Sequence, residues 1–295
     1  GVDGLVGTGD DVTTTYGFAV GNGAEASLKF TGTTFDAVAS TLNGRSAITG
    51  VTTNAAVTGH ANFDANQSNL VVFTANPTAA QSFTGGSAAD IFLDISAGVG
   101  TAYNVSTGAG NDAIVIAQTN TGAHTITGGT GADRVVLSAA AGVDTVVLTE
   151  GDSTASAWDV ITNFKTGADK LDLSSFTTGA AAKLTSTVWA DIDADAAAET
   201  VAVAATGEVT IGLSGGGNAV IGKDVSVASV VSFLAANSTT VNDTFFFRYD
   251  SNGSGAIDAA DNAIFFQNLG TDLVVELVGS ATNSVAGFSV AADLI

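Results

Sequence analysis

Two interleaved series of short apolar runs recur along the middle of the chain with the same spacing. The runs of the first series each follow an Asn or Asp, and these leading residues are 21, 22 and 21 positions apart. They are Asn69, Asp90, Asp112 and Asp133. A second series, spaced by 22 and 21 residues, lies between them at 83–86, 105–108 and 126–129. Two series of equal period indicate a structural repeat.

Each run has three to five β-forming residues between Gly, Thr or Asn turns, which is too short for a helix and typical of a strand. Two strands per repeat describe one coil of a parallel β-solenoid, in which stacked coils bury a column of Val, Ile, Leu and Phe. Because the coils lie only about 4.8 Å apart, small residues are favoured at positions outside this column. The sequence therefore predicts an all-β protein built on a parallel β-solenoid, or β-roll, with coils of about 21 residues.

The repeat fades outside residues 60–150, which divides the chain into four predicted parts. Residues 1–59 form a β-rich N-terminal segment with one short helix at 35–42. Residues 60–150 form the solenoid, and 151–240 a β-rich region that caps it. Residues 241–295 hold a polar calcium loop and the end of the chain. Outside the solenoid we expect strands at 201–203, 209–213, 244–248 and 273–278 and a helical turn at 227–235.

The charge of the chain restricts its partners. It has 29 acidic and 8 basic residues, for a net charge of −21. Nucleic acid requires a basic surface, so it is excluded as a partner. The composition is 45% hydrophobic, which is enough for a core and argues against disorder. Repulsion on this scale opposes folding unless cations screen or bridge the carboxylates.

The turns of the first series combine glycines with an aspartate. Gly128–Val136 fits the pattern G-G-x-G-x-D-x-U-x at every defined position, where U is a large apolar residue. The turns that end at Asp112 and Asp90 each lack one glycine of the pattern, and Gly7–Asp11 is a partial copy. Glycines allow positive φ, which lets carbonyls face a common point, and Asp adds the hard oxygen that calcium prefers.

We therefore predict Ca²⁺ between the Asp90 and Asp112 turns and between the Asp112 and Asp133 turns. The predicted ligands are Asp90, Gly108, Gly110, Asp112, Gly129, Gly131 and Asp133. Aspartates and glycines also favour turns without metal, but three turns in register favour calcium. On the opposite edge an aspartate recurs only at Asp144, so we expect that edge to be largely free of metal.

A second signature, Asp250–Asp261, follows the EF-hand calcium loop, with Gly at position 6 and Ile at position 8. Its predicted ligands are Asp250, Asn252, Ser254, the Ala256 carbonyl, Asp258 and Asp261. Position 12 is Asp instead of Glu, which predicts moderate affinity. We expect a strand before the loop and a helix at 262–269 after it; the alternative is a polar hairpin loop. The acidic stretch Asp191–Asp195 has no Gly pivot and predicts a solvated turn.

Beyond these turns, Asp159-Val-Ile-Thr-Asn-Phe164 and Gly167-Ala-Asp-Lys-Leu-Asp-Leu-Ser174 resemble RTX proteins exported by type I secretion. The ending Asp293-Leu-Ile295 is similar to type I export signals. The resemblance implies a β-roll, calcium-triggered folding outside the cell and an uncleaved C-terminal signal. By position it assigns Asp169 and Asp172 to a further calcium ion. The Thr/Ala/Gly-rich composition is similar to that of RTX surface-layer proteins of Gram-negative bacteria.

Catalytic signatures are missing from the sequence. Zinc hydrolysis needs H-E-x-x-H or an equivalent cluster, and the only histidines, His60 and His124, are better explained as turn or strand-edge residues. There is no P-loop, and the single G-x-S-x-G string, Gly212–Gly216, is followed by Gly-Asn instead of a helical pattern. Paired Asp residues would suit a glycosidase, but the calcium turns account for them better. We predict a non-enzyme.

Two functional hypotheses remain. The first is a secreted structural protein of the cell surface, which assembles with copies of itself into a calcium-dependent surface layer. Its further partners would be the type I secretion apparatus and a cell-surface polysaccharide, bound through an anchor region outside this chain. The alternative is an adhesin or the calcium-binding secretion module of a larger RTX toxin or hydrolase. The lack of Met predicts a processed product or fragment, and no apolar run approaches the roughly 20 residues of a membrane span.

Overall fold

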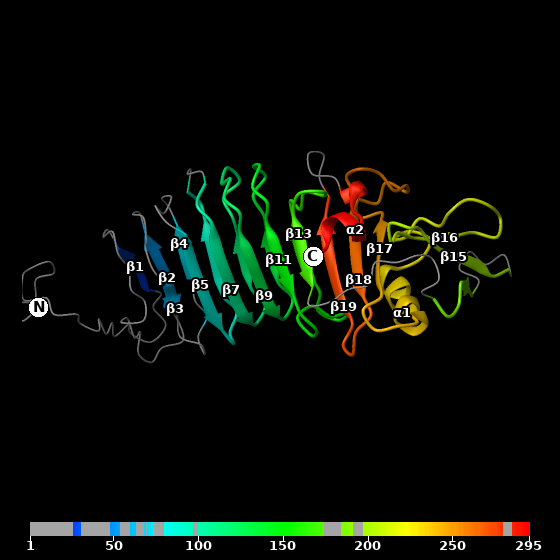
Figure 1. Cartoon of the computed structure of the whole chain (residues 1–295), viewed down its shortest axis with the longest axis horizontal. Helices are drawn as coiled ribbons and strands as arrows, with labels where there is room; N and C mark the ends of the chain where they lie inside the picture. Colours follow the sequence, from blue (N-terminus) through cyan, green and yellow to red (C-terminus); the bar gives the residue numbers. More distant parts are fainter. Residues whose placement is uncertain are drawn as a thin grey trace, which may run out of the picture.

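The protein is elongated, with strands stacked side by side along its long axis (Figure 1). The structure, a computed structural model, describes residues 26–30, 48–53, 60–62, 68, 70–73, 80–96, 100–173, 184–190, 197–279 and 285–295. The predicted helix at 35–42, the partial turn Gly7–Asp11 and the acidic stretch Asp191–Asp195 lie outside these residues.

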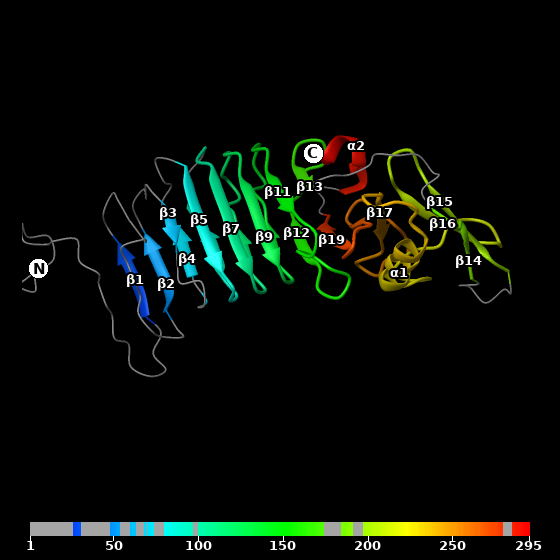
Figure 2. The same cartoon turned by 60° about the horizontal axis from the view of Figure 1, so that its bottom comes forward.

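Two parallel sheets form the stack, and the chain alternates between them so that each pair of strands makes one coil (Figure 2). The first sheet contains β1 (Ala26–Phe30), β2 (Ile48–Thr53), β4 (Leu70–Phe73), β6 (Ile91–Asp94), β8 (Ala113–Val115), β10 (Arg134–Val136) and β12 (Asp159–Thr162). The second contains β3 (His60–Asn62), β5 (Gln81–Gly86), β7 (Tyr103–Ala109), β9 (Thr125–Thr130), β11 (Thr145–Leu148) and β13 (Lys170–Leu173). The predicted parallel β-solenoid is confirmed.

The core of the solenoid consists of one apolar column per sheet. In the first sheet Phe92, Ile114, Val135 and Ile161 are in register from coil to coil, and all are buried. The second sheet adds a column of Phe83, Val105, Ile126, Val146 and Leu171. Side chains alternate between the inside and the outside of a strand, so these residues face inward. Apolar burial, at about 25 cal/mol per Å², holds the coils together.

Residues from the end of the chain close both sheets. In the first sheet β19 (Leu273–Val278) pairs in parallel with β12 and continues antiparallel into β18 (Asn262–Gln267) and β17 (Thr244–Tyr249). In the second sheet Leu173 N–H donates to Ile295 O, and Ile295 N–H donates to Leu171 O, both at 3.0 Å. Both views place this end of the chain beside β13 (Figures 1 and 2). The 3-10 helix η2 (Val285–Gly287) and the helix α2 (Val290–Asp293) lead into it.

The predicted helix at 262–269 is wrong, because residues Asn262–Gln267 form the strand β18. Five of its six residues are buried, and it lies between β17 and β19 with partners on both sides. Phe265 contacts the solenoid core on one face, while Ile264 and Phe266 contact a second core on the other. Aromatic and β-branched residues buried on both faces favour a central strand over a helix.

The second core belongs to a smaller unit at the far end of the molecule (Figure 1). It is formed by an antiparallel sheet of β14 (Val188–Trp189), β15 (Glu199–Val203) and β16 (Val209–Gly212), together with the helix α1 (Val227–Asn237). The N-cap Ser226 accepts a hydrogen bond from Ser229 N–H, which fixes the start of α1. The strands predicted at 201–203 and 209–213 and the helical turn at 227–235 are confirmed. In the part of the chain that the structure describes, no helix is long and apolar enough to cross a membrane.

Candidate metal centres on the two edges of the solenoid

Four aspartates of successive coils form a continuous hydrogen-bonded row, which we name the first-edge ladder. They stand at the entry to four strands of the first sheet and are Asp90, Asp112, Asp133 and Asp159. The N–H of each of the first three donates to Oδ1 of the next, over 2.6, 2.8 and 2.8 Å. The ladder therefore places one carboxylate per coil along a single edge.

The first-edge ladder concentrates negative charge in a buried environment. All four aspartates are buried, and Oδ2 of Asp112 and Oδ2 of Asp133 have no hydrogen-bond partner. Burial raises the pKa of Asp133 to about 7, and the Asp112 N–H, which lowers the pKa, only partly offsets this effect. Burial likewise raises the pKa of Asp159 to about 8 and raises the pKa of Asp112. A divalent cation beside these oxygens would remove the cost of ionising them.

Glycines allow the turns of neighbouring coils to lie against each other along this edge. Gly129 and Gly131 have φ values of 94° and 143°, which residues with a Cβ rarely adopt. A Cβ on Gly131 would lie 1.7 Å from Gly110 O in the preceding coil. A Cβ on Gly128 would lie 2.2 Å from Oδ2 of Asp133. The glycines thus keep carbonyl and carboxylate oxygens of successive turns in close proximity.

These residues fit calcium. Calcium takes six to eight hard oxygen ligands and accepts both carboxylates and backbone carbonyls. Among the residues that the structure describes, no three acidic, His or Cys side chains converge on one point. A site on this edge would therefore combine carboxylates of two coils with turn carbonyls, as predicted for Gly108, Gly110, Gly129 and Gly131.

A matching row, the second-edge ladder, follows the opposite edge. It comprises Tyr103, His124, Asp144 and Asp169. Tyr103 N–H donates to His124 Nδ1 over 3.1 Å, His124 N–H to Asp144 Oδ1 over 3.2 Å, and Asp144 N–H to Asp169 Oδ1 over 2.9 Å. Two positions of this ladder carry rings and two carry carboxylates.

The two rings give the second edge a neutral half. Because His124 Nδ1 accepts a hydrogen bond, the proton of the neutral ring is on Nε2. Burial lowers the pKa of His124 to about 4, so the ring is neutral at physiological pH. It stacks on Tyr103 with a centroid distance of 5.1 Å. His124 directly precedes β9, and His60 begins β3.

The sequence patterns do not assign Asp159 or Asp144 to a metal site. In the structure, Asp159 continues the first-edge ladder after Asp133, and Asp144 precedes Asp169 in the second-edge ladder. Asp159 follows Asp133 by 26 residues instead of 21, and the positions four and two residues before it are alanines, Ala155 and Ala157, instead of glycines. Its signal was the D-x-I-x-x-F motif, which it begins. Asp169 lies on the second-edge ladder, whereas Asp172 is a half-buried residue within β13 that pairs with Val147. A calcium ion held by Asp169 and Asp172 therefore stays a prediction.

The predicted calcium loop Asp250–Asp261 connects β17 and β18 as a hairpin, with Tyr249 and Asn262 as its last strand pair. Asp250 accepts hydrogen bonds from Ser254 N–H at 2.9 Å and from Gly255 N–H at 2.7 Å. Gly255, at position 6, has φ of 85°.

The other predicted ligands also turn toward the loop. Asp261 accepts from Ser251 N–H and Asp258 N–H, Asn252 Oδ1 accepts from Ser254 N–H, and Ser254 Oγ donates to the Ala256 carbonyl. The loop is a hairpin closed by its own carboxylates, and calcium within it stays a prediction.

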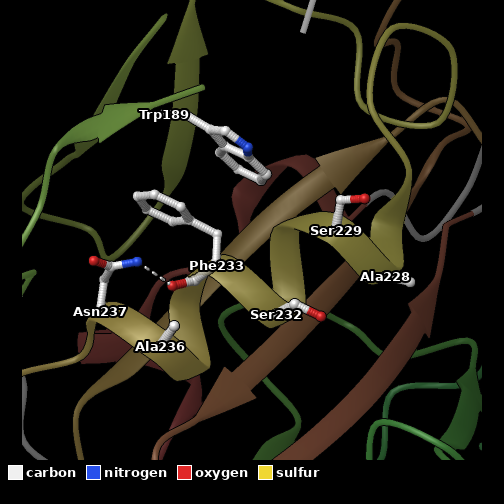
Figure 3. Close-up of a pocket in the computed structure, with 7 residues that line it drawn as sticks. All are labelled: Trp189, Ala228, Ser229, Ser232, Phe233, Ala236 and Asn237. Carbon is white, nitrogen blue, oxygen red and sulfur yellow. Dashed lines mark hydrogen bonds between the residues drawn. The ribbon is translucent and has the colours of Figure 1, made fainter. Parts of the chain in front are cut away.

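A surface pocket beside α1 carries no acid–base chemistry. It is lined by residues of α1 and by Trp189, which stacks on Phe233 with a centroid distance of 4.5 Å (Figure 3). Asn237 Nδ2 donates to Phe233 O at 2.9 Å. Seven residues line this pocket, and none is ionisable: Trp189, Ala228, Ser229, Ser232, Phe233, Ala236 and Asn237.

A parallel solenoid with glycine turns and rows of buried aspartates defines the class of RTX-type β-roll proteins. The chain belongs to the family described as "Peptidase M10 serralysin C terminal", whose model matches residues 15–232. This family is the calcium-binding, non-catalytic C-terminal domain of serralysin-type proteases, which are secreted proteins. A search of curated proteins found no match. The RTX resemblance is confirmed, whereas the resemblance to surface-layer proteins stays a prediction.

Proposed function

We propose that this chain is a calcium-dependent folding module of a protein exported by type I secretion. One observation carries the proposal: the first-edge ladder holds buried carboxylates with unpartnered oxygens, Oδ2 of Asp112 and Oδ2 of Asp133, between successive glycine turns. In the low calcium of the cytosol, repulsion between these groups keeps much of the chain unfolded and able to pass through the secretion apparatus. Outside the cell, calcium joins the coils, and metal binding drives folding.

The ladder offers three positions between successive carboxylates. The first two, Asp90–Asp112 and Asp112–Asp133, are those that the sequence predicts, and the third lies between Asp133 and Asp159. Each ion would bring two positive charges to a chain with a net charge of −21. The loop Asp250–Asp261 is proposed as a separate site of moderate affinity.

Calcium calorimetry paired with circular dichroism in EGTA tests the function. We expect the wild-type chain to lose part of its β signal and to melt at a lower temperature in EGTA, and to regain both with calcium. Asp112→Ala should abolish the two positions that share Asp112. Asp224→Ala removes the same charge from a half-buried position that belongs to neither ladder, and it serves as the matched control for the number of bound ions. A full β signal and an unchanged melting temperature in EGTA would refute the proposal.

A calcium-dependent surface layer is the second candidate. It is favoured by the open edge of the ten-stranded sheet, where β1 has a partner on one side only among the described strands. An unpaired edge of this kind is a route to lateral association. Electron microscopy of the purified chain separates the two candidates: ordered arrays that form only with calcium favour the layer, and dispersed monomers in both conditions favour the module alone.

A further inference from the structure

A lysine side chain reaches into the second edge of the solenoid. Lys165 Nζ donates to Ala140 O and, over 2.9 Å, to Gly142 O, both in the turn of the preceding coil. The same nitrogen lies 3.8 Å from Asp169 Oδ1. The side chain is only 16% exposed, so this ammonium is bound within the edge and is not a freely solvated surface charge.

The two carbonyls occupy the positions that the first edge reserves for metal ligands. Ala140 and Gly142 stand four and two residues before Asp144. Gly129 and Gly131 stand four and two residues before Asp133, and Gly108 and Gly110 before Asp112. On the first edge, the carbonyls at these two positions and the carboxylate of the next coil's aspartate together form the set of oxygens predicted to bind calcium. On the second edge the same set surrounds an ammonium.

The charges around the two ladders differ accordingly. On the first edge, the charges that act on Asp133 are those of Asp112 and Asp152, which raise its pKa. On the second edge, burial is the largest effect and raises the pKa of Asp144 and of Asp169, and the charge of Asp169 raises that of Asp144 further, but the charge of Lys165 lowers both. The second edge thus already contains a cation. On the first edge, the charges that act on Asp133 are all negative, and no cationic side chain among the described residues compensates them.

We propose that the Lys165 ammonium takes the place of a calcium ion between the Asp144 and Asp169 turns, so that this position is closed by the chain itself and binds no metal. The inference rests on the proposed function, because it treats calcium as the occupant of the equivalent first-edge positions. It replaces the calcium ion that the resemblance to RTX proteins assigns to Asp169 and Asp172. The ammonium joins the last two coils before calcium arrives, so the end of the solenoid nearest β19 is the part that needs calcium least.

Substitution of Lys165 by Met tests this occupancy, because Met keeps the length of the side chain and removes its charge. We expect Lys165→Met to bind one more calcium ion than the wild type in calorimetry. Its melting temperature should fall in EGTA and recover in calcium. Lys165→Arg keeps the charge and should bind the wild-type number of ions. Lys223→Met removes the same charge from an exposed site and should change neither quantity.

Two results of this comparison would overturn the inference. An unchanged melting temperature in EGTA would mean that the ammonium does not hold the edge. A lower melting temperature without the additional ion would mean that Lys165 only makes ordinary hydrogen bonds.

Lysine acetylation of the wild-type chain in saturating calcium is a second test that needs no variant. Protection of Lys165 relative to the exposed Lys223 is expected, and equal labelling would show that calcium displaces the ammonium. The proposed function and the inference about Lys165 can be refuted independently of each other. Absence of calcium binding by the wild type refutes the proposed function, whereas normal binding with a rapidly labelled Lys165 refutes only the lysine substitution for calcium.

Discussion

The backbone N–H of Asp112 donates a 2.8 Å hydrogen bond to Oδ1 of Asp133 in the next coil, while Oδ2 of Asp133 has no hydrogen-bond partner. One oxygen of the carboxylate therefore fixes the register of the two coils, and the other remains available to bind a cation. From this division we expect Asp133 to stabilise the stack when a metal ion is bound and to destabilise it when none is.

Asp133→Asn is expected to act in opposite directions with and without calcium. The amide oxygen can still accept from Asp112 N–H, but the buried charge is gone. In EGTA the midpoint of urea unfolding should therefore rise, whereas in calcium it should fall because two positions lose a charged ligand. At 100 times the dissociation constant, each occupied site contributes about 2.7 kcal/mol. A change of the same sign in both conditions would contradict the role of Asp133 as a calcium ligand.

The stability of the calcium-free chain should fall as the pH rises. Burial raises the pKa of Asp133 and of Asp144 to about 7 and that of Asp159 to about 8, from an unfolded value of 3.8. Between these values the folded state holds protons that the unfolded state has released, so this stability is complete below about pH 4 and is lost through pH 7 to 8. Melting curves in EGTA at pH 4.5 and pH 8 measure the difference.

Calcium provides the control for this pH series. It binds the ionised carboxylates, so the increase in melting temperature that it produces should be larger at pH 8 than at pH 4.5. A calcium-free chain that is more stable at pH 8 than at pH 4.5 would contradict the burial of these carboxyls.

Gly131→Ala should disrupt the first edge. A Cβ there would lie 1.7 Å from Gly110 O, and φ of 143° is almost confined to glycine. We expect a loss of about 3 kcal/mol or more of unfolding free energy. Gly151→Ala is the matched control, because Gly151 also has a positive φ, 87°, but nothing lies within 4 Å of its Cβ position. That control should lose only about 1–2 kcal/mol. Equal losses would mean that close contact between turns is unimportant.

Asp293→Ala should loosen the closure of the second sheet. Asp293 is buried and accepts hydrogen bonds from Gly167 N–H and Ser289 N–H. Leaving these donors unpaired costs about 1–3 kcal/mol, and the melting temperature in calcium should fall accordingly. Hydrogen exchange should show the loss at the amides of Leu173 and Ile295, which bond across this closure. Asp293→Asn keeps an acceptor oxygen, so its melting temperature should fall less than that of Asp293→Ala. Equal decreases for the two variants would argue against a hydrogen-bonding role of Asp293.

The repeat itself determined most of the solenoid. The spacing of Asp90, Asp112 and Asp133 predicted both the coil and the edge on which the carboxylates gather, because stacked coils of equal length bring equivalent residues into register. The strand β18 was mispredicted, because the polar loop before it has the form of an EF-hand loop and its burial on two faces depends on β17 and β19. Asp159 was missed because a longer coil interrupts the period.

The sequence alone established the all-β class, the glycine turns and the acidic row, since each follows from local periodicity and from the conformations that glycine permits. Only the tertiary structure decided which oxygens remain unpartnered and which cation lies beside them. Lys165 meets Ala140 and Gly142 across more than twenty residues of chain, and Ile295 meets Leu173 across more than a hundred. Such contacts depend on the lateral stacking of coils, so no local pattern encodes them.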